Sequence, residues 1–121
     1  MDDVPKIVLE MGAIINSLKK ATGELKPLAE IRATALSIYD KQIALTLIQL
    51  KNGIEFEIDG IKIVNPAVSV SEKMAKGICY KEKFNMEVAD TGYKSLRSRM
   101  DCLRASLLGC QSMCKVVSES M

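Results

Sequence analysis

The stretch YKSLRSRMDCLRASLLGCQSMCKV, residues Tyr93–Val116, decides the fold because its apolar side chains recur at alternating steps of three and four. The same spacing extends from Ala75 to Val117, with Glu82 as its one polar member. Such a heptad repeat forms a continuous apolar seam that a second long helix must cover. The sequence therefore predicts a long helix over residues 70–118, paired in a coiled coil or bundle.

The seam of this helix also predicts an oligomer interface. We count Tyr93 as heptad position a. Position a then holds Met86, Tyr93, Met100, Leu107 and Cys114. Position d holds Ala89, Leu96, Leu103, Cys110 and Val117. We expect subunits to meet through Tyr93, Leu96, Met100, Leu103 and Leu107, and through Phe56 and Ile63 of the hairpin described below.

The N-terminal part of the chain carries a second seam. Apolar residues recur from Val4 to Leu28 at heptad spacing, which predicts helix over residues 4–51. Pro27 lacks a backbone donor and crowds the preceding turn, so we expect a kink or a break there. Beyond it the pattern predicts a seam in a new phase, whose members would be Leu28, Ile31, Ala35, Ile38 and Leu45.

Residues 42–50, QIALTLIQL, fit either a buried helix end or a strand. The following KNG favours a helix end, because Lys suits the last turn and Asn-Gly the stop beyond it. If instead Asn-Gly is a hairpin turn, the sheet gains a third strand.

A β-hairpin is predicted over residues 54–64, IEFEIDGIKIV, where apolar and charged residues alternate on both sides of Asp59-Gly60. Asp-Gly suits the positive φ angles of a two-residue turn. This turn sets Phe56 opposite Ile63 on one face and Glu57 opposite Lys62 on the other.

The start of the final helix is predicted from Ser69 and Glu72, which have the spacing of a capping box. Gly77 leaves open whether a short first helix ends near it. The predicted architecture is mainly α: a long helix, a β-hairpin and a long helix, forming a coiled-coil-like helical hairpin. We expect one domain over residues 1–121 and a homo-oligomer, since a single chain leaves apolar surfaces to bury.

Composition argues against catalysis. The chain has no His, which removes the commonest general base and the usual zinc partner. The glycines do not form a phosphate-binding loop, and no carboxylate pair lies in an apolar setting. Cys110 and Cys114 are one turn apart and suit small apolar seam positions better than a metal site. We expect no enzyme activity, cofactor, metal or small-molecule substrate.

The N-terminal sequence and the cysteines predict a cytoplasmic location. Met1–Asp3 is acidic where a secretory signal would be basic, and the apolar run that follows is too short to span a membrane. Four cysteines without a secretory segment favour reduced thiols.

The remaining functional signal is the distribution of charge, because the formal net charge is only +2. The candidate phosphate-contacting residues are Lys73, Lys76, Lys81, Lys83, Arg97, Arg99 and Arg104. Tyr80 and Phe84 could stack on bases. The alternative is that Arg97, Arg99 and Arg104, which flank the seam, pair with acidic residues of a neighbouring helix.

Two resemblances bear on function. The order long helix, β-hairpin, long helix resembles the β-type subunit of prefoldin, whose hairpins assemble into a barrel; this implies a chaperone or adaptor. Residues 69–115, with the capped basic start SEKM, the step EVADTGY and an Arg/Leu-rich helix, resemble small phage-encoded recombination proteins, including the UvsY-like mediators. That resemblance implies a ring-like oligomer that binds single-stranded DNA and helps to load a recombination protein.

The sequence thus predicts, first, a non-catalytic oligomeric accessory protein of nucleic-acid metabolism, possible partners being single-stranded DNA and a recombination protein. The second hypothesis is a prefoldin-like chaperone or adaptor whose apolar helix tips hold a protein client. The third is an inhibitor or assembly factor that acts through its coiled coil.

Overall fold

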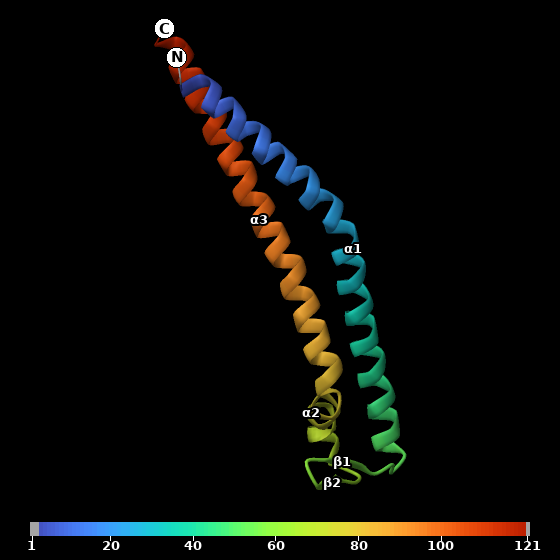
Figure 1. The fold of residues 1–121 in the computed structure, drawn as a ribbon. Helices are drawn as coiled ribbons and strands as arrows, with labels where there is room; N and C mark the ends of the chain where they lie inside the picture. Colours follow the sequence, from blue (N-terminus) through green and yellow to red (C-terminus); the bar gives the residue numbers. More distant parts are fainter. Residues whose placement is uncertain (1–2, 121) are drawn as a thin grey trace. The chain divides into compact units, whose positions relative to one another are not determined.

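The computed structural model describes residues 3–120 and confirms the mainly helical order (Figure 1). The elements are α1 (Asp3–Lys51), β1 (Phe56–Ile58), β2 (Ile61–Ile63), α2 (Val68–Ile78) and α3 (Tyr80–Glu119). Residues 1, 2 and 121, which the single predicted domain includes, lie outside the described residues.

The contacts of the chain divide it into two compact units. Unit 1 comprises Met1–Ala29 and Gly92–Met121, and unit 2 comprises Glu30–Thr91. Within unit 1, α1 and α3 run antiparallel, because Glu10 lies 3.8 Å from Cys110 while Glu24 lies 3.9 Å from Arg99. Figure 1 shows the first turns of α1 beside the last turns of α3.

The core of unit 1 is the predicted pair of seams. Ala21 of α1 is fully buried between Leu96 and Met100 of α3, and Leu18, Leu25 and Leu28 pack around them. Every α3 seam position from Met86 to Val117 is buried or half-buried, as its spacing predicts.

Pro27 does not break α1, which is one helix of 49 residues. A proline inside a helix removes one hydrogen bond and crowds the carbonyl four residues earlier, at a cost of about 3 kcal/mol. Leu25 and Leu28, on either side of it, both pack on the core of unit 1 and help to offset that cost.

The predicted change of seam phase after Pro27 is wrong. Ile31, Ile38 and Leu45 are 55%, 48% and 42% exposed. The seam of residues 4–28 instead keeps its heptad spacing beyond Pro27. This spacing places Tyr39 and Thr46 on the seam, where both are buried.

The partners that lie opposite α1 explain why polar residues occupy this seam. Arg32 Nε donates a 2.7 Å hydrogen bond to Asp90 Oδ1, which forms an ion pair within unit 2. Thr46 Oγ1 lies 3.4 Å from Cys79 Sγ, so the buried hydroxyl has a hydrogen-bonding partner. Because buried polar groups are tolerated when they are paired, α1 keeps its phase without an apolar residue at each position.

Residues 42–50 are helix, and α1 ends in a Schellman motif. Gly53 has a φ of 76°, its N–H donates to the Leu50 carbonyl, and the Ile54 N–H donates to the Gln49 carbonyl. These two bonds satisfy carbonyls that the end of a helix would otherwise leave unpaired.

The hairpin has the predicted register. Phe56 pairs with Ile63 and Glu57 with Lys62. Asp59 and Gly60 have φ angles of 50° and 81°, as a two-residue turn between antiparallel strands requires.

The predicted capping box at the start of the final helix is wrong. Helix α2 begins at Val68, and its N-cap residue, Ala67, makes no side-chain cap hydrogen bond. Ser71 instead donates back to the Ala67 carbonyl at 3.0 Å. The chain enters the helix directly after Pro66, whose ring restricts the backbone before this start.

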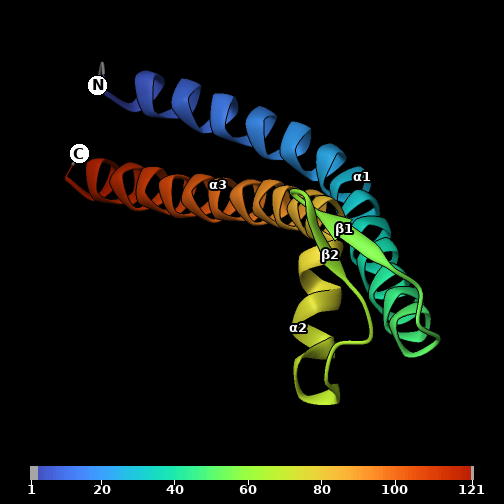
Figure 2. The ribbon, with the colours of Figure 1, turned by 90° about the horizontal axis from the view of Figure 1, so that it is seen from below.

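Cys79 separates α2 from α3 with a φ of −89° and a ψ of 30°, two residues after Gly77. The short first helix that Gly77 left open is therefore present, and Figure 2 shows α2 turning away from the first turns of α3. A side chain at Gly77 would meet no atom within 4 Å, so close packing does not require this glycine.

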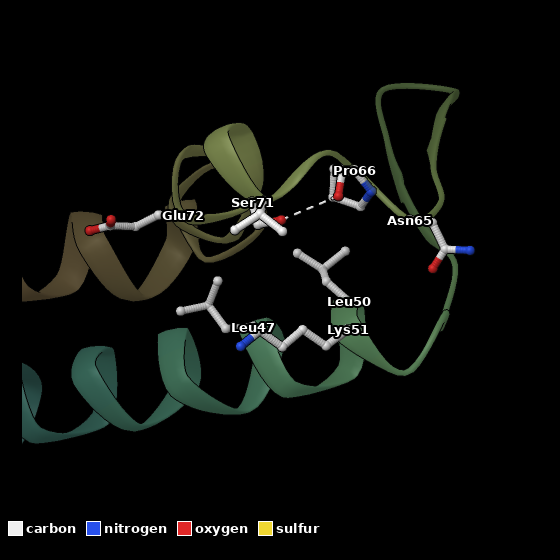
Figure 3. Close-up of a pocket in the computed structure, with 8 residues that line it drawn as sticks. Leu47, Leu50, Lys51, Asn65, Pro66, Ser71 and Glu72 are labelled. Carbon is white, nitrogen blue, oxygen red and sulfur yellow. Dashed lines mark hydrogen bonds between the residues drawn. The ribbon is translucent and has the colours of Figure 1, made fainter.

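Helix α2 lies over the end of α1 and leaves a hollow of about 400 Å³. Figure 3 shows Leu47 and Leu50 of α1 pointing toward Pro66 and Ser71 across this hollow. This side of α1 is therefore covered within unit 2.

Replacing Gly53 with Ala tests the Schellman motif. We expect Gly53→Ala to lower the free energy of unfolding by about 1 kcal/mol, because a Cβ atom is strained at positive φ. Gly23→Ala is the matched control and should raise it by up to about 1 kcal/mol, since Gly23 lies within α1 with nothing near its missing Cβ. Urea unfolding followed by circular dichroism measures both; equal effects would contradict this role of Gly53.

Candidate nucleic-acid interface

The seven predicted phosphate-contacting residues are divided between the two units. Lys73, Lys76, Lys81 and Lys83 lie in unit 2, whereas Arg97, Arg99 and Arg104 lie in unit 1. Residues 30–91 contain eight Lys or Arg and nine Asp or Glu, whereas the sequence of unit 1 contains nine and six. The excess of positive charge therefore belongs to unit 1.

In unit 2, the four lysines are exposed at the start of the final helical region. Lys76 lies 3.5 Å from Glu72, one turn earlier in α2. Lys73, Lys81 and Lys83 make no ion pair with any residue between 3 and 120. The predicted stacking residues Tyr80 and Phe84 are also exposed here, so unit 2 offers cations and aromatic rings but no net positive charge.

Arg99 takes the helix-pairing role that was the alternative to phosphate binding. Its guanidinium lies 3.9 Å from the Glu24 carboxylate of α1. Both residues occupy position g of their heptads, and g positions face each other on one side of an antiparallel helix pair. This contact therefore identifies the g side of unit 1.

The e side, opposite to it, is strongly basic. Positions e and b lie three or four residues apart and are neighbours on the surface of a helix. In unit 1 the charged residues at these positions are Lys19, Lys26, Lys94, Arg97, Arg104 and Lys115, with Asp101 as the one acidic residue. We call these six cations the basic face; all six are exposed. The g side carries Glu10 and Glu24 beside its cations.

The two arginines of the basic face do not pair with α1 within the described residues. Arg97 lies over the Tyr93 ring, with its guanidinium carbon 5.9 Å from the ring centroid, and its Nη1 donates to the Tyr93 hydroxyl at 3.4 Å. Arg104 pairs with Asp101 of its own helix at 3.3 Å. Both contacts are local and exposed, so they leave the guanidinium groups open to a ligand.

Sequence reasoning identified Arg97 and Arg104 but missed Lys19, Lys26 and Lys115. Their spacing was visible in the heptad repeat, since each occupies position b. Only the antiparallel pairing of α1 and α3 brings the b positions of both helices to the same side as the e positions.

The seam residues expected at an oligomer interface are used within the chain. Leu96 and Met100 pack on Ala21, while Tyr93, Leu103 and Leu107 are half-buried along α3. Phe56 and Ile63 of the hairpin are half-buried as well.

Cys110 and Cys114 occupy the α3 seam, where Cys110 is buried and Cys114 half-buried. The Cys110 thiol donates a 3.8 Å hydrogen bond to Glu10 Oε2. Burial raises the pKa of the Cys110 thiol, and the negative charge of Glu10 raises that pKa further. Among the described residues, no three or more Cys, Asp or Glu side chains are grouped so that they could hold a metal ion.

Thiol reactivity tests this packing. We expect iodoacetamide to modify exposed Cys102 well before Cys110 at neutral pH, because the thiolate is the reactive form and a raised pKa keeps Cys110 protonated. The rate at which iodoacetamide modifies Cys110 should increase as the pH is raised above the usual range of thiol pKa values. Peptide mass spectrometry after timed labelling measures both sites, and urea should remove the difference. Equal rates in the folded protein would contradict the buried environment of Cys110.

Comparisons with known proteins return no relative of this chain. No protein-family model matches it, and neither does any curated protein or solved structure. None of the helices in residues 3–120 combines the length and apolar character that crossing a membrane requires.

Proposed function

We propose that this protein is a non-catalytic accessory protein of nucleic-acid metabolism that binds single-stranded DNA through the basic face. The supporting observation is the grouping of six cations with a single acidic residue on one side of unit 1. The opposite side carries Glu10 and Glu24, so the charge is directional even though the whole chain has a net charge of only +2.

The geometry of the basic face suits a phosphate backbone. Arg97 and Arg104 are separated by two helical turns, or about 10 Å, and so are Lys19 and Lys26 on the neighbouring helix. Two parallel rows of cations provide a track that does not depend on base sequence. Arginine guanidinium groups bind phosphate with two parallel hydrogen bonds, which makes Arg97 and Arg104 the expected anchors.

The resemblance of residues 69–115 to phage recombination mediators agrees with this proposal. A homo-oligomer would repeat the basic face and raise its affinity for a long strand through multivalency. In that arrangement the protein holds single-stranded DNA for a recombination protein and needs no chemistry of its own.

A charge-reversal variant tests the basic face. We expect the wild-type protein to bind fluorescein-labelled single-stranded DNA with an affinity that falls steeply as salt rises, because binding releases counterions. Arg97→Glu with Arg104→Glu should weaken binding by at least about tenfold and reduce the salt slope by about two, one for each lost phosphate contact. Fluorescence anisotropy at several salt concentrations measures both effects.

Lys6→Glu with Lys20→Glu is the matched control, since it changes the net charge equally at positions c on the g side. This pair should weaken binding much less. Equal loss in both variants would mean diffuse attraction rather than a face, and absence of binding at low salt would refute DNA binding altogether.

Exposed apolar side chains near both chain ends favour a second candidate function, the holding of a protein client. In unit 1 these are Val8 and Leu9 of α1, and Leu108, Met113 and Val116 of α3. A hollow of about 280 Å³ adjoins Met113 and Val116. Apolar helix tips are the client-binding feature that the prefoldin-like hypothesis requires. We refer to these five residues, which lie around the helix ends rather than on one side, as the terminal cluster.

Removing apolar surface tests the terminal cluster. We expect Leu9→Ser with Val116→Ser to reduce suppression of the aggregation of a chemically unfolded client by at least half, because apolar contact drives such binding. Leu36→Ser with Val88→Ser is the matched control and removes exposed apolar surface elsewhere. Light scattering during dilution of the client measures the effect; equal behaviour of the two variants would exclude a client site at the terminal cluster.

A further inference from the structure

The second half of α1 is apolar on more sides than its own chain covers. Residues 31–50 contain only three charged side chains. On one side Tyr39 and Thr46 are buried, with Thr46 against Cys79. Another side faces α2 through Leu47 and Leu50 (Figure 3). The third side is open. A helix that is apolar all round is normally buried all round, so this side is expected to have a partner.

The open side has the regular spacing of a helix-pairing seam. Ile31, Ile38 and Leu45 recur every seven residues, and Thr34, Lys41 and Ile48 recur in the same way three residues later. We call these six residues the outer stripe. Its four aliphatic members are between 42% and 55% exposed. A shallow hollow of about 330 Å³ lies along it, lined by Ala33, Thr34, Ser37, Ile38 and Lys41.

The total exposed surface of this chain is large for its mass. The protein exposes 8695 Å². A compact monomer of 13.3 kDa exposes only about 6,500 Å². The excess of roughly 2,000 Å² is more than the approximately 800 Å² that one partner contributes to an interface of standard size. A stable self-association therefore has enough surface available.

We infer that the outer stripe binds the outer stripe of a second copy of this chain, with the two α1 helices antiparallel. In an antiparallel pair, one set of stripe residues on each helix lies opposite the other set on its partner. The first set is Ile31, Ile38 and Leu45, and the second is Thr34, Lys41 and Ile48. Three layers follow, each formed twice by symmetry: Ile31 against Ile48, Thr34 against Leu45, and Ile38 against Lys41. Leu45 then lies over the hollow beside Thr34, and Lys41 covers Ile38 with its aliphatic stem while its ammonium group stays in water.

Charge complementarity selects the second copy and the antiparallel direction. Glu30 and Lys51 flank the outer stripe on the same edge at its two ends, 21 residues apart. Neither makes an ion pair with another described residue. In the antiparallel pair each Glu30 meets Lys51 of the other copy, which gives two ion pairs related by symmetry. A parallel pair would instead bring the two Lys41 side chains into one layer and leave Glu30 opposite Ala35.

Charge exchange in the full-length protein tests both the surface and the direction. Sedimentation velocity over a concentration series should show self-association of the wild type. Glu30→Lys and Lys51→Glu should each weaken dimerisation by about tenfold, because each creates two like-charge contacts. The double variant E30K/K51E should return to within about threefold of the wild type. Ile38→Glu should abolish dimerisation, with circular dichroism confirming that the helices remain.

Three results would overturn the inference. The wild type could remain monomeric at millimolar concentration, the Ile38→Glu variant could still dimerise while folded, or the double charge exchange could fail to restore association. DNA binding does not decide the matter, because the exchanged residues lie outside the basic face. Failure of this interface and failure of the proposed DNA binding are therefore separate outcomes.

Discussion

The antiparallel seam between α1 and α3 is the interaction on which the rest of the structure depends. Each helix has only the other to cover its seam, so the core is a single layer of side chains. Ala21 and Ala75 are the only fully buried residues in the described core. The larger side chains of the seam remain partly exposed to solvent along its edges. Such a layer buries little apolar area per residue and leaves the outer faces of the helices exposed.

The α3 seam and the hairpin were predictable from sequence because each depends on a local pattern. The heptad spacing of α3 is uninterrupted, and Asp59-Gly60 determines its own turn. The phase of α1 beyond Pro27 was not predictable in this way. Its most apolar residues, such as Ile31 and Ile38, indicate one seam. The partners actually present opposite α1, Asp90 of α3 and Cys79 just before it, pair with residues of another seam. Polar pairing across a seam depends on both helices, and hydrophobicity along one helix does not reveal it.

The candidate site was predictable to a similar extent. Arg97 and Arg104 could be identified from their positions beside the seam, but Lys19 and Lys26 joined them only once the helices were paired. Arg99, equally prominent in sequence, points to Glu24 on the other side. The direction of the neighbouring helix determines which charged residues face those at a given heptad position. Knowing that direction separates the face that we propose for phosphate binding from a row of helix-pairing charges.

The Schellman motif at Gly53 also has a consequence for the order of folding. This motif helps to reverse the direction of the chain. Contacts near the reversal therefore close short loops, since Thr46 and Cys79 are 33 residues apart. Contacts near the chain ends close long loops, since Glu10 and Cys110 are 100 residues apart. Loop closure costs more entropy as the loop lengthens. We therefore expect the helices to pair from the hairpin toward the chain ends, so that the turns near both chain ends, with their exposed apolar residues, pair last. The same turns should be the first to open when the folded protein unfolds locally.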